Sequence, residues 1–294
     1  MPVPLRVRSF AKINLALAVL GKRPDGFHEI RTVFQSIDLH DELEFHESAG
    51  LQLECESLPD LPAEQNLAWK AAEALSRHAG SSRGVRILLK KNIPPGAGLG
   101  GGSSNAAAAL LGLCRLWNLE VPRLELTSLA AGLGSDVPFF LEGGTALGIG
   151  RGEEIYPLPP TASAPLIVVY PGVHVSTAEA YRSLNLRLTS REATHKIQSL
   201  CGRLSDGLDF LAGIFNDFET SILPAYPAIL EAKNFLIHRG AAAAMLSGSG
   251  SSVFGFFLDE ESAFAAARAE RPADWRVLPA KTLSRAEYSR RLFG

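Results

Sequence analysis

A glycine-rich segment carries the clearest chemistry in the sequence. Residues 94–105 (PPGAGLGGGSSN) run directly into residues 106–117, whose alanines and leucines favour a helix. Glycine has no Cβ, so the backbone can turn sharply and approach an anion closely. Ser103, Ser104 and Asn105 are good N-cap residues, and the free N–H groups of a helix start carry partial positive charge. The segment therefore predicts a phosphate-binding loop built from the backbone.

Three rival interpretations of this loop are weaker. A plain surface turn does not need five glycines between two prolines and a capped helix. Gly96-x-Gly98-x-x-Gly101 matches the dinucleotide-binding fingerprint, and Glu120 stands at a suitable distance, but a second helix rather than a strand is expected next. A P-loop would end in Gly-Lys-Ser/Thr, whereas this loop ends in Gly-Gly-Ser-Ser. The signatures of protein kinases are absent as well.

Taken with other segments, the loop resembles the ATP-binding motif of the GHMP small-molecule kinases. Residues 11–15 (AKINL) resemble the N-terminal motif of that family, and residues 247–252 (SGSGSS) its C-terminal glycine loop. Residues 24–29 (PDGFHE) and 134–140 (GSDVPFF) are similar to those of one branch of the family, which acts in the non-mevalonate isoprenoid pathway. The motifs occur in the family order and span nearly the whole chain.

The resemblance implies an α+β fold of two domains with a cleft between them. Residues 1–160 would form an ATP-binding domain similar to the second domain of ribosomal protein S5. Residues 165–294 would form a ferredoxin-like domain on the substrate side, after a proline- and serine-rich linker around residues 158–165. The implied donor is ATP with Mg²⁺. The implied acceptor is the 2-hydroxyl of a cytidine diphosphate-linked methylerythritol.

Asp136 is the candidate catalytic base, because a carboxylate beside an acceptor hydroxyl can take its proton as the bond to phosphorus forms. The alternative is a helix cap, since a helix is expected to end just before it. Lys12 is its candidate partner, although a lysine on a strand can also be an ordinary solvated side chain. Asn14 stands two residues further on, on the same side of the strand, where it can contact the acceptor.

The resemblance also assigns residues to ATP. Asn66 and Lys91 match positions near the adenine, and Ser104 is expected near the magnesium ion, whose acidic ligands the motifs leave open. The predicted ATP-binding residues are Asn66, Lys91, Pro94, Gly96, Gly98, Leu99, Gly100, Gly101, Gly102, Ser103 and Ser104.

The acceptor side is assigned in the same way. His28 is expected to bond the cytosine edge, with aromatic contact from nearby rings. Relatives commonly have tyrosine where this chain has Phe27, so a bond from that hydroxyl must be absent. Phe34 and Tyr181 can equally be core aromatics. The predicted substrate-binding residues are Asn14, Phe27, His28, Phe34, Thr177, Tyr181, Gly248, Ser249 and Gly250.

Alternating and helical periodicities predict the elements that must position these residues. Strands are expected at residues 5–8, 13–20, 42–46, 51–56, 85–89, 139–141, 145–149, 166–170, 242–246, 253–258 and 275–280. Helices are expected at residues 64–78, 106–117, 123–133, 177–184, 192–203, 208–223, 228–239 and 261–270.

Composition limits the remaining possibilities. The chain has 294 residues, 20% of them charged, and a net charge of −2, which argues against a nucleic-acid binder. No apolar run is long enough to cross a bilayer, so no membrane partner is expected. The three cysteines are scattered, as in a reducing cytoplasm, and the seven histidines form no zinc-like cluster. Oligomeric state is left open.

Two functional alternatives stay open. The same fold can phosphorylate another acceptor, such as homoserine or mevalonate, although residues 27–28 and the segment around Asp136 argue against this. The chain can also be a sensor that kept the fold and lost the chemistry. The presence of Lys12, Asn14 and Asp136 together argues against that alternative.

Overall fold

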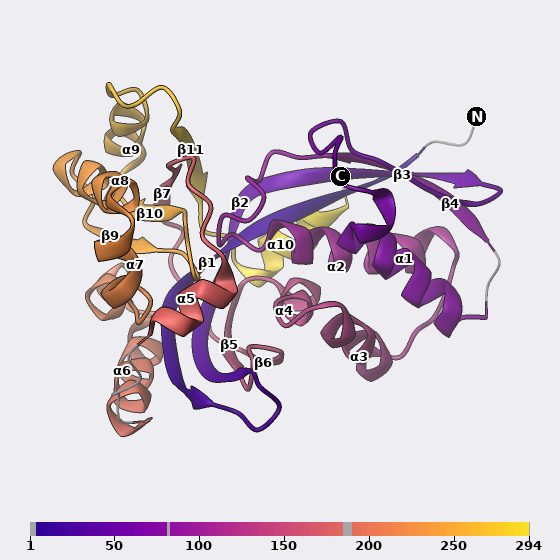
Figure 1. Cartoon of the computed structure of the whole chain (residues 1–294), viewed down its shortest axis with the longest axis horizontal. Helices are drawn as coiled ribbons and strands as arrows, with labels where there is room; N and C mark the ends of the chain where they lie inside the picture. The colour runs from indigo at the N-terminus through magenta and orange to yellow at the C-terminus, as the bar shows by residue number, and fades with distance from the viewer. Residues whose placement is uncertain (1–3, 81–82, 185–189, 294) are drawn as a thin grey trace.

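The computed structural model describes residues 4–80, 83–184 and 190–293, which form two β-sheets with helices packed against them (Figure 1). The first, seven-stranded sheet is built on two long antiparallel strands, β1 (Leu5–Lys22) and β2 (His28–Ser48). Its shorter strands are β3 (Leu51–Glu54), β4 (Gly84–Lys90), β5 (Thr145–Ile149), β6 (Glu154–Pro157) and β8 (Phe215–Asn216). The order is β3-β4-β2-β1-β8, while β5 pairs with β2 and β6 with β5.

Strand β1 connects the parts of the molecule. Strand β4, which lies between β3 and β2, alternates, with Val85, Ile87 and Leu89 buried between more exposed neighbours. Strand β1 is instead buried continuously over residues 9–19. Its residues join all three hydrophobic clusters of the described chain in turn, from Val7 in the first to Val19 in the third. A polar side chain in the middle of β1 is therefore buried as well.

Helices cover one face of the first sheet (Figure 1). They are the 3-10 turn η1 (Ala63–Gln65), α1 (Leu67–His78), α2 (Gly101–Leu116), α3 (Arg123–Leu133) and α4 (Val137–Glu142). Helix α2 packs between the sheet and helices α1 and α4, and its small residues allow the close approach. A Cβ on Gly112 would lie 2.8 Å from the ring of Phe45. This packing fixes the helix that follows the glycine loop.

The second sheet has the ferredoxin-like topology that the sequence predicts. It contains β7 (Pro165–Tyr170), β9 (Ala243–Leu246), β10 (Val253–Phe256) and β11 (Arg276–Lys281), in the order β11-β7-β10-β9 and with antiparallel pairs throughout. Helix α8 (Pro227–His238) packs on β9 and β10, and α9 (Glu260–Ala267) on β7 and β11. This is the split β-α-β arrangement.

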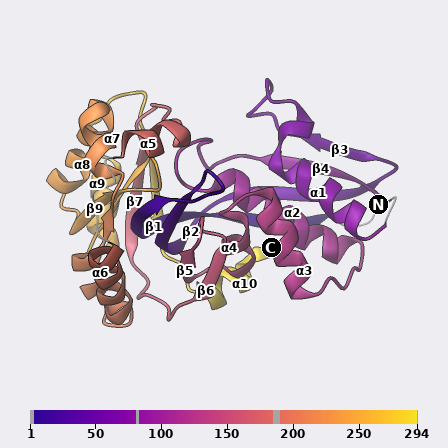
Figure 2. The ribbon, with the colours of Figure 1, turned by 60° about the horizontal axis from the view of Figure 1, so that its bottom comes forward.

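Elements from late in the chain also contact the first sheet (Figure 2). Strand β8 pairs in parallel with β1, and α6 (Ser190–Arg203) packs beside it. The last helix, α10 (Arg285–Leu292), returns to the first hydrophobic cluster, where Tyr288 Oη donates to the carbonyl of Phe140 at 2.6 Å. The predicted boundary between residues 160 and 165 falls at the start of β7, and the division into two domains stays a prediction.

Several predicted elements are wrong or incomplete. Residues 139–141 form part of helix α4 rather than a strand, because Phe139 and Phe140 pack inward from a short helix whose first turn holds Pro138. The predicted helix at residues 208–223 is divided into η2 (Asp209–Gly213), β8 and α7 (Glu219–Ala225). Strand β6, helix α10 and the first half of β2 were not predicted.

Within the described ranges, no helix is long and apolar enough to span a membrane.

Candidate active site

A cavity of about 880 Å³ lies where β1, the glycine loop, helix α5 (Thr177–Ser183) and the loop after β9 meet. It brings together predicted residues from segments that are far apart in the sequence. The predicted residues that line the cavity are Lys12, Asn14, Phe27, His28, Phe34, Gly96, Gly98, Gly100, Ser103, Asp136, Thr177, Tyr181, Gly248, Ser249 and Gly250.

Lys12 and Asp136 face each other in this cavity. Lys12 is only 4% exposed, and its Nζ lies 3.5 Å from Asp136 Oδ2. The same Nζ donates to Asn14 Oδ1 at 2.7 Å, since side chains two apart on a strand share a face. Asn14 Nδ2 in turn donates to Thr32 Oγ1, also at 2.7 Å. The ammonium is thus held in one place, beside the carboxylate that it can stabilise.

Asp136 stands at the N-cap position of α4, but its side chain makes no capping hydrogen bond. The preceding segment ends helix α3 at Gly134, and the side chain of Asp136 keeps 32% of its surface exposed. A carboxylate that is not used to cap its helix, yet lies beside a buried lysine, is available to a ligand. This geometry favours the catalytic interpretation over the capping one.

The glycine loop is held against β1 and against the loop after β9. Gly96, Gly98 and Gly100 have φ values of +64°, +78° and +69°, which residues with a Cβ rarely adopt. A Cβ on Gly98 would lie 2.1 Å from the carbonyl oxygen of Ser247, whose Oγ donates to the Gly98 carbonyl at 2.9 Å. Lys12 N donates to the carbonyl of Leu99 at 3.0 Å. The loop therefore lies directly beside the Lys12–Asp136 pair.

Helix α2 starts at this loop, earlier than the sequence predicts. Its N-cap is Gly100, and no side chain caps it. The N–H groups of its first turn are therefore left for a ligand, and the helix dipole adds partial positive charge there. Because α2 has 16 residues and is packed along its length, the position of these groups is rigid. An anion such as a phosphate fits this end of the helix.

A buried polar network supports the loop from behind. Asp41, fully buried, accepts from Lys91 Nζ and from Asn105 Nδ2, the latter at 2.9 Å. Asn105 Nδ2 also lies 2.8 Å from Ser9 Oγ, which donates to Ser104 Oγ at 2.7 Å. No local pattern in the sequence marks Asp41 or Ser9, because their side chains meet this network only when β1, β2 and α2 come together.

Two predicted adenine residues lie outside the cavity lining. Lys91 is engaged in the network described above, with Nζ also 3.0 Å from Asn105 Oδ1. Asn66 is the N-cap of α1, and its Oδ1 accepts from the N–H of Ala68 at 2.9 Å. Lys91 lies beside the glycine loop, since a Cβ on Gly101 would lie 3.0 Å from its Nζ, and Leu67, the residue after Asn66, would lie 3.5 Å from a Cβ on Gly102. Their assignment to adenine stays a prediction.

The part of the cavity that carries the predicted substrate-binding residues is aromatic. The rings of His28 and Tyr181 stack at 4.5 Å between centroids and 15° between planes. Tyr181 also meets Phe218 edge-on at 4.9 Å. Phe34 is 1% exposed and packs on Phe139, so it belongs to the core while one side faces Lys12. Helix α5 and the loop after β9 meet through Thr177 Oγ1 and Ser249 Oγ, which share a hydrogen bond of 3.1 Å.

Burial controls the charge of two of these rings. Burial, followed by the nearby charge of Lys22, lowers the pKa of His28 below its ordinary 6.5, so the imidazole is neutral at pH 7. A neutral imidazole offers one donor and one acceptor. Burial, with a smaller contribution from the charge of Asp136, raises the pKa of Tyr181 to about 12. The phenol therefore stays protonated.

Several cavity residues were not predicted from the sequence. Lys22, Arg151, His174 and Arg182 line the cavity together with the predicted set. The lining holds one carboxylate, that of Asp136, and four lysine or arginine side chains, namely Lys12, Lys22, Arg151 and Arg182, although the whole chain has a net charge of −2. Such an excess of positive charge attracts an anionic ligand. No local motif marks these residues, because only the folded chain brings their charges together.

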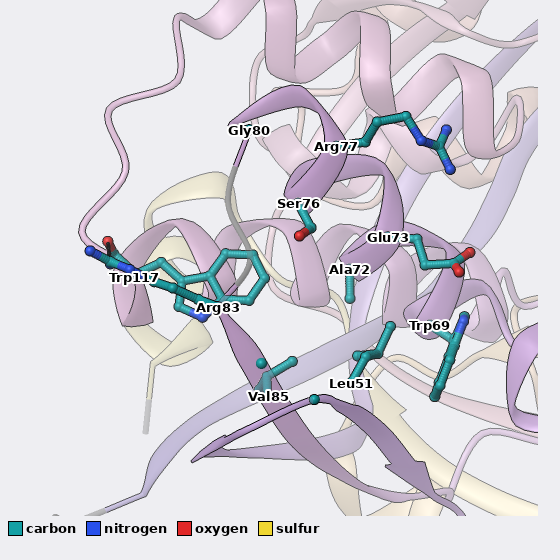
Figure 3. A pocket seen from close by; sticks show the side chains of 12 residues that line it. Leu51, Trp69, Ala72, Glu73, Ser76, Arg77, Gly80, Arg83, Val85 and Trp117 are labelled. Carbon is teal, nitrogen blue, oxygen red and sulfur yellow. Dashed lines mark hydrogen bonds between the residues drawn. The ribbon is translucent and has the colours of Figure 1, made fainter.

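A second cavity, of about 510 Å³, is lined by residues of α1, β3 and β4 (Figure 3). Trp69 and Trp117 lie at opposite ends of it, with Leu51 and Val85 between them. It shares no lining residue with the first cavity and holds none of the predicted site residues.

Comparison with known proteins assigns this arrangement to a family. Residues 66–144 match the GHMP kinases N terminal domain, and residues 198–271 match GHMP kinases C terminal. A 4-diphosphocytidyl-2-C-methyl-D-erythritol kinase of Chlorobium phaeobacteroides (strain BS1) is 45% identical over 268 residues, which cover 90% of this chain and 93% of the relative. The chain belongs to the 4-diphosphocytidyl-2-C-methyl-D-erythritol kinase family of GHMP kinases. It is accordingly an ATP-dependent small-molecule kinase.

Further comparisons agree with membership of this kinase family. The namesake kinase of Pelotomaculum thermopropionicum is 44% identical over 276 residues, covering 93% of this chain and 96% of the relative. A crystal structure of 4-(cytidine 5'-diphospho)-2C-methyl-D-erythritol kinase is 34% identical, covers 94% of this chain and 98% of its own, and superposes with a TM-score of 0.79. The homoserine kinase of Cytophaga hutchinsonii, 20% identical with a TM-score of 0.75 over 96% of each chain, shares the fold alone.

Proposed function

We propose that this GHMP kinase transfers the γ-phosphoryl group of ATP to the 2-hydroxyl of 4-diphosphocytidyl-2-C-methyl-D-erythritol, in the cytoplasm and within the non-mevalonate isoprenoid pathway. The observation that carries the proposal is the Lys12–Asp136 pair, with 3.5 Å between Nζ and Oδ2, placed between a glycine loop and an aromatic pocket. The relatives that bear this name match the chain nearly end to end.

In the proposed mechanism Asp136 accepts the proton of the acceptor hydroxyl as that oxygen attacks the γ-phosphorus. Lys12 orients Asp136 and offsets the negative charge that develops on the transferred group. Asn14 fixes the ammonium, through the 2.7 Å hydrogen bond from Lys12 Nζ. The N–H groups at the start of α2 hold the phosphates of ATP in line with the acceptor.

In this proposal the two predicted domains supply different parts of the site. The domain of residues 1–160 supplies the glycine loop and the catalytic pair. The domain of residues 165–294 supplies Thr177 and the loop after β9. A Cβ on Gly248 of that loop would lie 3.4 Å from Lys12 Nζ, so its backbone lies beside the catalytic pair, where the acceptor's diphosphate would pass. The positive lining of the cavity supports an acceptor that carries a diphosphate.

Recognition of the cytosine is assigned to the aromatic part of the cavity. A neutral His28 can donate to one edge atom of a base and accept from another. Phe27 offers an exposed ring for stacking on the base. The protonated Tyr181 orients His28, because the rings of these two residues stack on each other. An acceptor without a base would leave these groups unused, so the proposal predicts dependence on the cytidine portion.

Magnesium would accompany the nucleotide. Across the parts of the chain that the structure covers, no three His, Cys, Asp or Glu side chains cluster as a metal site. This suits an ion that kinases hold mainly through substrate phosphates, water and one or two protein oxygens. Ser103 lines the cavity, and Ser104 Oγ accepts a single hydrogen bond from Ser9, so their oxygens are the candidate protein ligands. When bound, Mg²⁺ would neutralise phosphate charge.

The direct test is ADP release by the purified protein with ATP and Mg²⁺. The cytidine-linked acceptor should be turned over rapidly, whereas methylerythritol phosphate without cytidine, homoserine and mevalonate should be turned over slowly or not at all. Faster phosphorylation of homoserine or mevalonate would overturn the substrate assignment. ATP binding without turnover of any acceptor would favour a sensor.

A further inference from the structure

Two turns meet at the mouth of the catalytic cavity. One joins β1 to β2 and carries Phe27, and the other joins β5 to β6 and carries Arg151. Both residues line the cavity, and the carbon Cζ of Arg151 lies 4.8 Å from the centroid of the Phe27 ring. This distance is well within the range of a cation–π contact.

The backbone of the Phe27 turn is fixed, but its ring is not packed. Asp25 Oδ1 accepts from Phe27 N at 3.1 Å, and the Phe27 carbonyl accepts from Arg23 N at 2.8 Å. The residue is nevertheless 52% exposed. The Phe27 ring makes its cation–π contact with the guanidinium of Arg151. A guanidinium thus lies over the ring of a residue that lines the cavity and keeps about half of its surface exposed.

Arg151 is itself held in place. Its Nε donates to Glu153 Oε1 at 2.9 Å, and its backbone N–H donates to Glu153 Oε2 at 2.6 Å. The turn is tied to β2 because Ile30 N donates to the carbonyl of Gly150 at 2.8 Å. A planar guanidinium that is fixed by a carboxylate can orient an aromatic ring better than a flexible ammonium can.

We propose that Arg151 is a positioning residue for base recognition: it holds the Phe27 ring so that the ring's free face stacks on the acceptor's cytosine. This inference rests on the proposed function. It makes Arg151 act through Phe27 rather than by pairing with a phosphate. A positively charged residue that only attracted the diphosphate would not need a ring beneath it or a two-point contact with Glu153.

A double-mutant cycle tests this coupling. Arg151→Met should raise KM for the cytidine-linked acceptor and Kd for CDP about 3- to 10-fold. Phe27→Leu should raise both about 10-fold. The double variant should be no worse than Phe27→Leu, since Arg151 acts through the ring. KM for ATP should stay unchanged in all three variants. Additive losses, or equal damage to ATP, would overturn the proposal.

Arg151→Lys separates stacking from charge. It keeps the charge and loses the planar group, so it should be impaired nearly as much as Arg151→Met. If it matches the wild type while Arg151→Met is impaired, charge alone matters and the proposal fails. Arg86→Met is the matched control. Arg86 does not line the cavity, and its Nε donates to Glu54 Oε1 at 2.8 Å. This substitution should change neither KM for the acceptor nor Kd for CDP. Should Arg151→Met not fold, the cycle is run with Arg151→Lys.

The two proposals can fail separately. If the wild type phosphorylates the cytidine-linked acceptor but the cycle shows no coupling, only the role of Arg151 is wrong. If the wild type neither turns over that acceptor nor binds CDP, the proposed function and the role of Arg151 are both wrong.

Discussion

The two sides of the larger cavity differ in whether backbone groups or side chains form them. The side that we assign to the nucleotide (the nucleotide side) is mainly backbone: a glycine loop with positive φ angles, the open start of α2, and a buried network around Asp41 behind it. The side that we assign to the acceptor (the acceptor side) is mainly side chains, many of them exposed, that come from the β1–β2 turn, the β5–β6 turn and α5. Phosphate recognition through backbone suits any nucleotide, whereas selection of one acceptor needs particular side chains.

This difference predicts different responses to mutation. Changes on the nucleotide side should act through backbone geometry and packing, and should affect ATP. Changes on the acceptor side should affect KM for the acceptor and spare ATP. The catalytic pair lies between the two sides and should affect turnover alone.

The largest effect is expected at the pair itself. Asp136→Asn removes the base but keeps the size of the side chain, so kcat should fall on the order of 10²–10⁴-fold. The Kd for ATP, measured by calorimetry, should be almost unchanged. Asp206→Asn, at an exposed position outside the cavity, is the control. Turnover near that of the wild type would show that Asp136 is not the base.

A smaller but still large effect is expected in the glycine loop. Gly98→Ala places a Cβ 2.1 Å from the Ser247 carbonyl at a φ of +78°, so the loop must shift. Since a left-handed backbone alone costs an ordinary residue about 1–2 kcal/mol, KM for ATP should rise roughly tenfold or more.

Gly132→Ala is the matched control for this substitution, because nothing lies within 4 Å of its Cβ position in α3. It should leave KM for ATP unchanged and stabilise the helix slightly. If Gly98→Ala behaved like Gly132→Ala, the nucleotide side would not depend on the close approach of the loop to Ser247.

His28→Ala should raise KM for the acceptor about 2- to 10-fold, the value of one or two hydrogen bonds, with little effect on ATP. The pKa of His28 is lowered, so the ring is neutral above that pKa and gains a proton as the pH falls through it. KM of the wild type should therefore rise on acidification below pH 6.5, and KM of His28→Ala should rise less. Identical pH profiles of KM would mean that His28 does not read the base.

The smallest effect is expected at the exposed contact between α5 and the loop after β9. Ser249→Ala removes the 3.1 Å hydrogen bond to Thr177 Oγ1. Because both hydroxyls can bond to water instead, KM for the acceptor should rise less than about threefold. A loss as large as that of His28→Ala would show that this contact is part of acceptor recognition rather than a minor link.

The same contrast explains what could be predicted from the sequence. The glycine loop, Lys12, Asn14 and Asp136 could be selected from the sequence because backbone chemistry and a family pattern are visible in short segments, and the structure brings them to one cavity. The ferredoxin-like sheet was predicted through the same resemblance and is confirmed by the order of its strands.

The residues that were missed lack such marks. Lys22 ends strand β1 and Arg151 lies in the β5–β6 turn, and only the folded chain brings them to one cavity. Asn216 was placed in a predicted helix, but it lies in β8 and donates to the carbonyls of Leu246 and Gly248, both at 2.8 Å. The apolar pattern of residues 208–223 resembles a helix, and pairing of β8 with β1 overrides it.

Product analysis by NMR tests the central claim most directly. The cytidine-linked acceptor, ATP, Mg²⁺ and the protein should yield one new phosphomonoester signal in the ³¹P spectrum. Carbon–phosphorus coupling should place it on the carbon that bore the 2-hydroxyl, while the diphosphate signals of the acceptor stay intact. A phosphoryl group on another hydroxyl, or no new phosphomonoester with this acceptor, would contradict the account.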